Sequence, residues 1–435
     1  MKFSANEDCI QVIDETTNVV NIINELTMHG TTNNEDPFYI FDIGDVVKKH
    51  QSWIERMPRV IPHYAVKCND NDVVLATLAA LGTSFDCASK VEISKVLSLG
   101  VQPERIIYAN PCKSKSSIIY AREVGVKTMT FDCDIELQKI KKLFPDANLV
   151  LRIRCEAEIA QCALGKKFGC DPVIEAPKLL KTARSLNLNV VGISFHVGSG
   201  CADFPIYRKA LGFCKVLFMK AEELGYNLTI VDIGGGFPGD NDKSIDEVSI
   251  IINQSLEEYF PEKHVRVIAE PGRFYVASAF TLITNVHSKK NIYNPLSDEI
   301  ESTMLYINDG VYASFNCLLY DHQIVKPKLL KDHSETEKTI KTTIFGPTCD
   351  ALDEIIVGAN MPESIDLGDF IYFENMGAYT LPVASPFNGF PLPKVYHFIE
   401  RDMWQMVRSM IPVEANDRFI EDFIGKTIEI VSTTA

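Results

Sequence analysis

Several polar side chains stand at the ends of short apolar runs in the first two thirds of the chain. They comprise a lysine, two carboxylates, an imidazole, a serine, a run of glycines and two arginines, namely Lys67, Asp86, Arg152, His196, Ser199, Gly234, Gly235, Gly236, Glu270 and Arg273. A lysine amine can bind a carbonyl carbon as a Schiff base, and glycine N–H groups with an arginine fork can bind phosphate. Taken singly, each residue also has a structural explanation, such as a surface lysine, a core histidine, an ion pair or a tight turn.

The segments that must position these residues alternate between strands and helices. Eight short β-rich runs are expected at His63–Val66, Thr83–Cys87, Arg105–Ala109, Lys127–Phe131, Leu149–Ile153, Val190–Phe195, Thr229–Ile233 and Arg266–Ala269. Amphipathic helical stretches separate them, for instance Val73–Leu81, Lys90–Leu99, Pro177–Leu186 and Tyr207–Leu224. Continuous apolar strands that alternate with helices indicate a parallel sheet covered on both faces. Eight units in roughly 250 residues favour an α/β fold of the (β/α)8 barrel type over an open sheet.

A barrel of this type would bring the polar strand ends to one rim, because the active sites of such barrels lie at the carboxyl ends of the strands. The glycine run follows the seventh expected strand and Arg273 follows the eighth, which is where barrels bind phosphate. A lysine on the same rim then favours pyridoxal 5′-phosphate, held covalently by Lys67. No metal ligand set is expected.

The expected pattern of secondary structure changes after Ala279. Strand-like segments separated by Pro, Gly and Asn turns follow without alternating helices, at Ser278–Val286, Ser302–Ile307, Thr339–Phe345, Asp369–Glu374 and Lys394–Ile399. They predict a second, mainly antiparallel β domain, to which the N-terminal residues add a strand. We therefore expect a pyridoxal-phosphate-binding barrel over residues 38–279 and a β domain formed by residues 1–37 and 280–435.

Composition narrows the possible partners and the compartment. The 435 residues contain 43 Lys and Arg against 58 Asp and Glu, a net charge of −15 that argues against nucleic-acid binding and suits cationic small molecules. No apolar run approaches the ~20 residues of a membrane span, and no signal-peptide pattern opens the chain. The twelve cysteines are scattered without a C-x-x-C pair, which indicates reduced thiols and a cytoplasmic protein.

Long sequence blocks in a fixed order resemble one enzyme family. They include YAVKCND, FDCASKVEI, SFHVGSG, DIGGGFPG, IAEPGRFYVASAF, INDGVYASFNCLLYDH, GPTCDALD and FENMGAYT, between about Asp36 and Met406. The chain resembles the eukaryotic ornithine decarboxylases, of the alanine-racemase-like barrel class of pyridoxal-phosphate enzymes. The resemblance implies decarboxylation of L-ornithine to putrescine and CO2, the first step of polyamine biosynthesis.

The resemblance also implies roles for the residues at the barrel rim. Lys67 would be the Schiff-base lysine, His196 would stack on the cofactor ring, and Glu270 would pair with the pyridine nitrogen. The residues around the phosphate would be Ser199, Gly234, Gly235, Gly236, Arg273 and Tyr379, with Asp86 and Arg152 nearby. A carboxylate at the pyridine nitrogen keeps that nitrogen protonated, which makes the ring a strong electron acceptor.

A homodimer with shared active sites is a further implication of the resemblance. Cys349 and Asp350 would enter the site from the second subunit and face Asp321, and the substrate pocket would be lined by Tyr320, Tyr312 and Phe387. Two aspartates suit the ammonium tail of ornithine by charge and by hydrogen bonding. Cys349 would join Lys67, His196 and Glu270 as a catalytic residue that returns a proton to the α-carbon.

Alternative hypotheses remain for the activity. An antizyme inhibitor is a catalytically inactive relative that binds antizyme, the inhibitor protein of this family. Such inhibitors have lost cofactor and substrate residues that this chain retains, namely Asp86, Arg152, Arg273, Asp321, Cys349 and Asp350. We therefore favour the enzyme and count antizyme as an expected partner.

Decarboxylation of lysine, arginine or meso-diaminopimelate is the other alternative. Asp321 disfavours the distal carboxylate of diaminopimelate, whereas lysine differs from ornithine by one methylene, worth only ~1–3 kcal/mol. Three departures from the family pattern, at Gly165, Ala313 and Pro386, bear on fine substrate preference.

Overall fold

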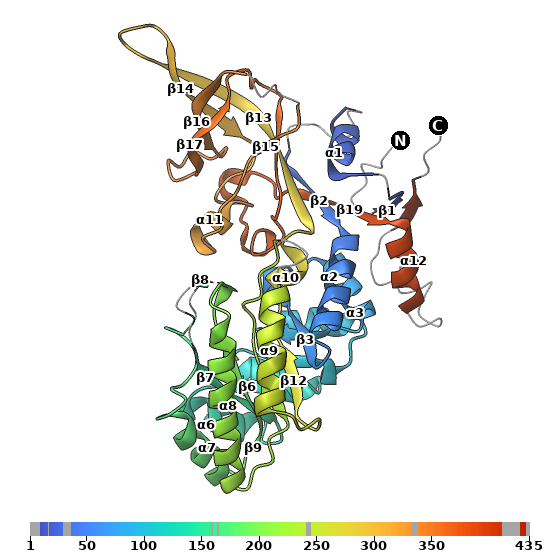
Figure 1. Ribbon diagram of the computed structural model, residues 1–435, viewed down its shortest axis with the longest axis vertical. Coiled ribbons are helices and arrows are strands. Elements are labelled where there is room, and N and C mark those ends of the chain that lie inside the picture. Colours follow the sequence, from blue (N-terminus) through green and yellow to red (C-terminus); the bar gives the residue numbers. More distant parts are fainter. Residues whose placement is uncertain are drawn as a thin grey trace. The chain divides into compact units, whose positions relative to one another are not determined.

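A computed structural model describes residues 9–15, 17–28, 36–155, 157, 160–162, 165–240, 245–331, 337–410 and 427–431 of the chain (Figure 1). The chain divides into two compact units, Val46–Val276 and Met1–Asp45 with Ala277–Ala435. We call the first the barrel unit and the second the sheet unit. None of the described helices is both long and apolar enough to cross a membrane.

The barrel unit is built on a closed ring of eight parallel strands, which confirms the expected (β/α)8 barrel. Around the ring the order is β11, β12, β3, β4, β5, β6, β7 and β9. The strands span β3 (Val60–Ala65), β4 (Ser84–Cys87), β5 (Ile106–Tyr108), β6 (Thr128–Phe131), β7 (Asn148–Arg154), β9 (Asn189–His196), β11 (Ile230–Asp232) and β12 (Arg266–Ala269). Each of the eight runs predicted from the sequence therefore forms one barrel strand.

Helices before and after the barrel strands cover the ring. They are α2 (Ile43–Arg56), α3 (Asp72–Ala80), α4 (Lys90–Ser98), α5 (Lys115–Glu123), α6 (Asp134–Leu143), α7 (Ala176–Ser185), α8 (Pro205–Glu223), α9 (Asp246–Tyr259) and the short α10 (Arg273–Val276). The side chains of Asn71, Ser89 and Ser114 accept hydrogen bonds from backbone N–H groups and so fix where α3, α4 and α5 begin. A small antiparallel pair, β8 (Ala160–Cys162) and β10 (Ser199–Cys201), lies beyond the ends of β7 and β9.

The interior of the barrel is an apolar plug rather than a channel. Ile107, Val150, Ile230 and Ile268 come from four different strands and form one buried cluster. Burying an aliphatic side chain of this size stabilises a fold by roughly 1.5–3 kcal/mol. This apolar cluster therefore fills the barrel interior beneath the polar residues at the strand ends and supports them rigidly.

The described residues of the sheet unit form a ten-stranded sheet. The main path runs β17, β16, β14, β13, β2, β19, β1, β20, and β18 pairs with both β13 and β15. The strands span β1 (Cys9–Ile13), β2 (Phe38–Asp42), β13 (Phe280–Tyr293), β14 (Ile300–Ile307), β15 (Lys328–Leu329), β16 (Thr339–Phe345), β17 (Glu354–Pro362), β18 (Phe370–Phe373), β19 (Lys394–Glu400) and β20 (Thr427–Ile430). The helices are α1 (Val19–Met28), α11 (Asn316–Tyr320) and α12 (Arg401–Met410), with 3-10 turns η3 (Leu381–Val383) and η4 (Phe387–Gly389).

The sheet is mixed, with antiparallel and parallel pairs. The expected antiparallel pairs join β13 to β2, β14 and β18, and β15 to β18 and β16 to β17. Parallel pairs join β19 to β1 and β2, β1 to β20, and β14 to β16. The N-terminal strand expected from the sequence is β1.

Strand β2 (Phe38–Asp42), which the sequence analysis counted with the barrel, pairs with β13 and β19 of the sheet unit. Its partners begin more than two hundred residues later, so its local pattern alone does not reveal them. Phe41 stacks on Phe280 at 4.3 Å between ring centroids, which anchors the strand in the core of this unit.

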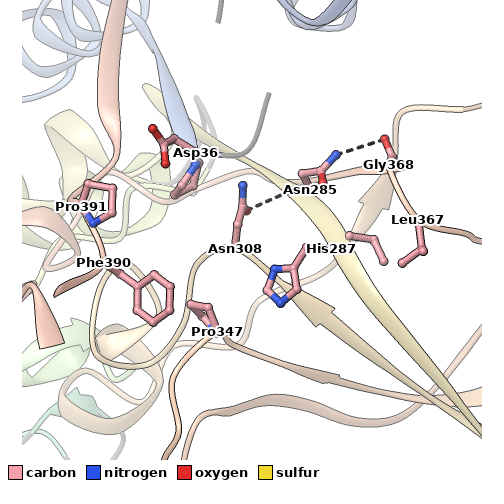
Figure 2. A pocket seen from close by; sticks show the side chains of 11 residues that line it. Asp36, Asn285, His287, Asn308, Pro347, Leu367, Gly368, Phe390 and Pro391 are labelled. Atoms are coloured by element: carbon pink, nitrogen blue, oxygen red, sulfur yellow. Dashed lines mark hydrogen bonds between the residues drawn. The ribbon is translucent and has the colours of Figure 1, made fainter. Parts of the chain in front are cut away.

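A pocket of about 500 Å³ opens in the sheet unit (Figure 2). Its lining includes Asp36, His287, Asn308 and Pro347, and none of the candidate site residues. The backbone N–H of Asn285 donates to the side-chain oxygen of Asn308 at 2.9 Å, which holds that side chain along the wall (Figure 2). The pocket therefore lies beside the loop that leads through Pro347 to Cys349.

Candidate active site

Lys67 and Asp86 form an ion pair at the mouth of the barrel. Lys67 lies in the 3-10 turn η1 (Val66–Cys68), directly after β3, and Asp86 lies on the neighbouring strand β4, where it is paired in register with Ala65. The Asp86 carboxylate is buried, whereas the Lys67 side chain is 41% exposed. The lysine amine is therefore accessible to a ligand while a buried charge fixes its position.

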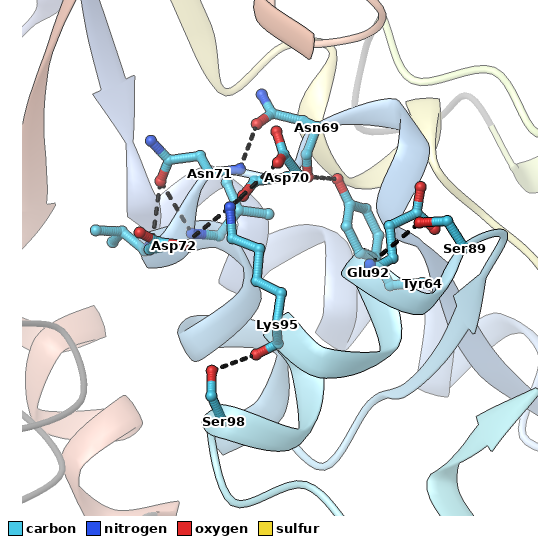
Figure 3. A network of polar contacts seen from close by, with 11 residues as sticks. Tyr64, Asn69, Asp70, Asn71, Asp72, Ser89, Glu92, Lys95 and Ser98 are labelled. Atoms are coloured by element: carbon cyan, nitrogen blue, oxygen red, sulfur yellow. Dashed lines mark hydrogen bonds and ion pairs between the residues drawn. The ribbon is translucent and has the colours of Figure 1, made fainter. Parts of the chain in front are cut away.

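The chain after Lys67 is held by a polar network (Figure 3). The Tyr64 hydroxyl donates to the carbonyl oxygen of Asn69 at 2.8 Å. Lys95 forms an ion pair with the carboxylate of Asp70 at 3.1 Å. Because Lys95 lies on α4, which follows the strand of Asp86, the network ties together the two segments that carry the Lys67–Asp86 pair.

His196 ends β9 and presents a neutral ring. The backbone N–H of Gly198 donates to its Nδ1 at 3.1 Å, so the proton of the neutral imidazole is on Nε2. Burial, together with the charges of Arg152 and Lys67, holds the pKa of His196 well below its usual range. Arg152 lies on the adjacent strand β7, with its guanidinium 5.2 Å from the ring centre of Phe168.

The glycine run fits against His196 because it lacks side chains. Gly234 has φ +63°, and a methyl group there would lie 2.1 Å from the carbonyl oxygen of Phe195. A methyl group on Gly235 would lie 2.8 Å from Nε2 of His196. The Tyr207 hydroxyl donates to the carbonyl oxygen of Gly235 at 2.8 Å. The run is therefore a tightly packed cradle and not merely a flexible turn.

Arg273, Ser199 and the glycine run come together on one side of the barrel mouth. The Arg273 guanidinium donates to the Ser199 hydroxyl at 3.0 Å, and the Cys201 N–H donates to the carbonyl oxygen of Gly236 at 3.0 Å. A guanidinium, a hydroxyl and backbone N–H groups are the donor set that binds phosphate. The residues present therefore fit the phosphate end of a pyridoxal cofactor.

Two buried carboxyls lie at the ends of β11 and β12. Burial raises the pKa of Asp232 to about 7, and burial together with the Asp232 charge raises the pKa of Glu270 well above its usual range. In its ionised form, a carboxyl group beside a ring nitrogen stabilises the protonated, cationic form of that nitrogen. Sequence analysis missed Asp232, although its place at a strand end, two residues before Gly234, was a usable signal.

A second group of candidate residues lies in the sheet unit. The Tyr312 hydroxyl donates to the Asp350 carboxylate, and the Tyr312 ring stacks on Phe387 at 4.2 Å. The Cys349 N–H donates to the side-chain oxygen of Asn388 at 3.1 Å, and the cysteine is exposed. Hydrogen bonds from the N–H of Leu352 and from Tyr312 lower the pKa of Asp350. The structure thus brings Tyr312, Cys349, Asp350 and Phe387 together.

The buried carboxylate of Asp353 holds the two loops of this second group. It accepts the N–H of Val311 at 2.8 Å and the hydroxyl of Thr348 at 2.7 Å. A methyl group on Gly310 or Gly346 would lie 2.1 or 2.2 Å from this carboxylate, so both positions require glycine. Sequence analysis missed Asp353, because an aspartate within a turn carries no signal of its burial.

The remaining candidate residues also lie in the sheet unit. Asp321 follows α11 and is 4% exposed, and its N–H donates to the carbonyl oxygen of Cys317 at 3.1 Å. Tyr320, beside it, is 69% exposed. Tyr379 has φ +55°, a left-handed backbone that is uncommon for a residue other than glycine.

Comparison with known proteins relates both units to one family. Residues 43–277 match the family model described as the pyridoxal-binding domain of pyridoxal-dependent decarboxylases. Ornithine decarboxylase of Rattus norvegicus is 47% identical over 419 residues, which cover 94% of this chain and 90% of that protein. The chain belongs to the ornithine decarboxylase family. Its cofactor is accordingly pyridoxal 5′-phosphate.

Other members of this family differ in their named activity. Antizyme inhibitor 2 of Xenopus laevis is 47% identical over 397 residues, covering 89% of this chain and 86% of that protein. Among solved structures, the Paramecium bursaria Chlorella virus arginine decarboxylase bound to agmatine superimposes with a TM-score of 0.80 at 37% identity, covering 87% of this chain and 99% of that one. Membership of the family therefore does not by itself identify the reaction, and the residues of the candidate site are needed as well.

Proposed function

We propose that this protein decarboxylates L-ornithine to putrescine and CO2 with pyridoxal phosphate, and so performs the first step of polyamine biosynthesis. The observation that carries the proposal is the Lys67–Asp86 ion pair beside the glycine cradle and the Arg273–Ser199 contact. These contacts support the proposal because Lys67 offers an accessible amine, and the glycine cradle with Arg273 and Ser199 offers donors suited to a phosphate. Both lie in the region that matches the pyridoxal-binding domain of the decarboxylase family.

In this proposal the barrel residues hold the cofactor. Lys67 binds it covalently, and Glu270 faces the pyridine nitrogen and keeps it protonated. His196 offers a neutral, flat face to the ring. The phosphate is held by Ser199, Gly234, Gly235, Gly236, Arg273 and Tyr379, with Asp86 and Arg152 beside the ring. When bound, the cofactor supplies the electron-accepting ring on which decarboxylation depends.

The sheet-unit residues bind the substrate tail and move a proton. Asp321 and Asp350 bind the distal ammonium group, and Asp350 is suited to this because its lowered pKa keeps it ionised. The rings of Tyr312, Tyr320 and Phe387 enclose the aliphatic part of the substrate. The Cys349 thiol returns a proton to the α-carbon after CO2 has left, so that the product is a primary amine.

Two chains form a homodimer in this proposal, and each site uses Cys349 and Asp350 of the partner subunit. Support comes from the surface around Asp321, where Leu319, Tyr320 and Ile324 are 51%, 69% and 84% exposed. Large apolar side chains that are exposed close together in the sequence are consistent with a surface covered by a partner. In a dimer with a twofold axis, each chain would contribute its Cys349 and Asp350 to the partner's site and would receive the same residues from the partner.

Antizyme is a further proposed partner, because an antizyme inhibitor is among the relatives. The retained Lys67, Asp86, Arg273 and Cys349 favour a working enzyme over an inactive inhibitor. We also propose a cytoplasmic location, because the twelve cysteines are scattered along the sequence without a C-x-x-C pair, as expected of reduced thiols.

Release of CO2 from carboxyl-labelled ornithine, lysine and arginine, measured side by side, tests the proposed function. We expect the highest kcat/KM for ornithine, with lysine lower by ~10–200-fold because one extra methylene must be accommodated. A higher kcat/KM for lysine or arginine would replace ornithine as substrate. Absence of CO2 from all three, with antizyme still bound, would favour the inhibitor hypothesis.

A further inference from the structure

Asp232 is a fully buried carboxyl at the floor of the candidate cofactor site. It is the last residue of β11, and its Oδ1 accepts the N–H of Gly234 at 2.9 Å. Its side chain also shares a hydrogen bond with the side chain of Glu270. Burying a carboxyl group beside a second carboxyl costs stability, so Asp232 calls for a functional reason.

Asp232 is linked to Glu270 through the backbone of the glycine run. The N–H of Glu270 donates to the carbonyl oxygen of Gly234 at 2.7 Å, and Gly234 is itself bonded to Asp232. Gly234 also lies against His196, because a methyl group on it would be 2.9 Å from the Cα of that histidine. Asp232 therefore fixes a block of backbone that supports both Glu270 and His196.

The two carboxyls also interact electrostatically. The groups that face Asp232 are Glu270, Asp86, Arg152 and the Cys214 thiol, and those that face Glu270 are Asp232, Asp86, Lys67 and Arg152. Burial is the main reason that both carboxyls bind protons strongly, and the Asp232 charge adds to the proton affinity of Glu270.

We propose that Asp232 is a positioning residue that orients Glu270 and adds negative charge beneath the pyridine nitrogen of the cofactor. This inference rests on the proposed function, in which Glu270 faces that nitrogen. A second carboxylate behind the first raises the proton affinity of a nearby ring nitrogen, because it stabilises the cationic form. Asp232 thereby favours the protonated ring over a wider range of pH than Glu270 alone.

The Asp232→Asn variant of the holoenzyme tests this role. The amide oxygen still accepts the N–H of Gly234, while the negative charge is lost. We expect the pH-dependent change in the visible absorbance of the bound cofactor to move to lower pH by about one unit, a tenfold loss of proton affinity. We also expect weaker cofactor binding in a titration of the protein with pyridoxal phosphate. Glu258→Gln, which removes a surface carboxylate from α9, is the matched control and should leave both unchanged.

A stability measurement shows that the variant is folded. Since the pKa of Asp232 is raised to about 7, its ionisation costs folding free energy that is incurred as pH rises from about 4 to 7. The Asp232→Asn variant lacks this cost. The Tm of the variant minus the Tm of the parent should therefore be larger at pH 8 than at pH 5. A pH-independent Tm difference would contradict the buried ionisation on which the inference rests.

Glu270→Gln separates this inference from the proposed function. If Glu270→Gln shifts the absorbance titration and Asp232→Asn does not, Glu270 faces the nitrogen and the role of Asp232 is refuted alone. If neither variant shifts it, the assignment of Glu270 in the proposed function fails, and the inference fails with it. A shift in both variants, larger for Glu270→Gln, supports the inference.

Discussion

The amine of Lys67 is paired with the buried carboxylate of Asp86, which lies on the next strand of the barrel. The pair results from parallel register, because Ala65 and Asp86 are partners across β3 and β4 and Lys67 follows two residues later. The buried Asp86 carboxylate holds the amine of Lys67 in place, while the exposed part of the Lys67 side chain leaves the amine accessible to a ligand. The predictions below test the consequences of this arrangement.

Replacing Lys67 by alanine should remove covalently bound cofactor and lower kcat on the order of a thousand-fold or more, because no other amine in the site is assigned this task. The measurement is CO2 release at saturating ornithine and cofactor. A variant that keeps both its visible absorbance and its activity would show that another lysine binds the cofactor.

Mixed dimers test whether sites are shared between subunits. Lys67→Ala and Cys349→Ala chains should each be nearly inactive alone, whereas mixing should restore about a quarter of parental activity, since half of the dimers carry one complete site. Subunit exchange must be verified with differently tagged chains. If exchanged dimers stay inactive, Cys349 acts within its own chain or has no role in the reaction.

Asp321 should determine recognition of the substrate tail. Asp321→Asn keeps the shape but removes a charge-assisted contact worth ~1.5–3 kcal/mol, so kcat/KM for ornithine should fall about ten- to a hundred-fold. Cofactor affinity should change little, because Asp321 is assigned to the tail. Unchanged kcat/KM would mean that the ammonium group is bound elsewhere.

Gly235→Ala should weaken cofactor binding without unfolding the barrel. The added methyl group would meet both Nε2 of His196 and the carbonyl oxygen of Glu270 at 2.8 Å, so the ring and the carboxyl must move apart. Titration with pyridoxal phosphate measures the effect, which we expect to be about tenfold or more in Kd. Gly212→Ala, on α8 with its nearest contact at 3.8 Å, is the control and should bind normally.

Acid should destabilise the barrel through His63. Burial lowers its pKa to about 3, so below pH 6.5 the unfolded chain binds a proton that the folded chain does not. The free energy of unfolding should therefore fall by up to about 1.4 kcal/mol for each pH unit between 6.5 and 3. Urea unfolding of the parent and of His63→Gln over this range gives the comparison. Equal slopes for the two proteins would show that His63 is protonated in the folded state.

The barrel was predictable from sequence because each strand and the following helix are neighbours in the chain. The pattern of apolar residues predicted all eight barrel strands. The ends of those predicted strands pointed to Lys67, Glu270 and Arg273 as candidate residues. The sheet unit was less predictable, because strands such as β1 and β19 meet across almost the whole chain. For the same reason, residues of the sheet unit such as Cys349 were identified from family resemblance and not from periodicity.

Burial explains which site residues escaped sequence analysis. Asp232 and Asp353 act through backbone N–H groups that they bind, and a sequence does not reveal which N–H groups a carboxylate will meet. The glycines around them, Gly234 and Gly346, were visible in the sequence. Their steric requirement became clear only once the neighbouring chain segments were placed.

The most direct test of the account is to locate the cofactor on the chain. The purified protein is reduced with borohydride, digested, and the peptide that carries the reduced pyridoxyl group is identified by mass spectrometry, while an unreduced portion is assayed for CO2 release from ornithine. The account predicts a single labelled peptide containing Lys67, in a preparation that forms putrescine and CO2 in equal amounts. A label on another lysine, or an active preparation without any label, would contradict it.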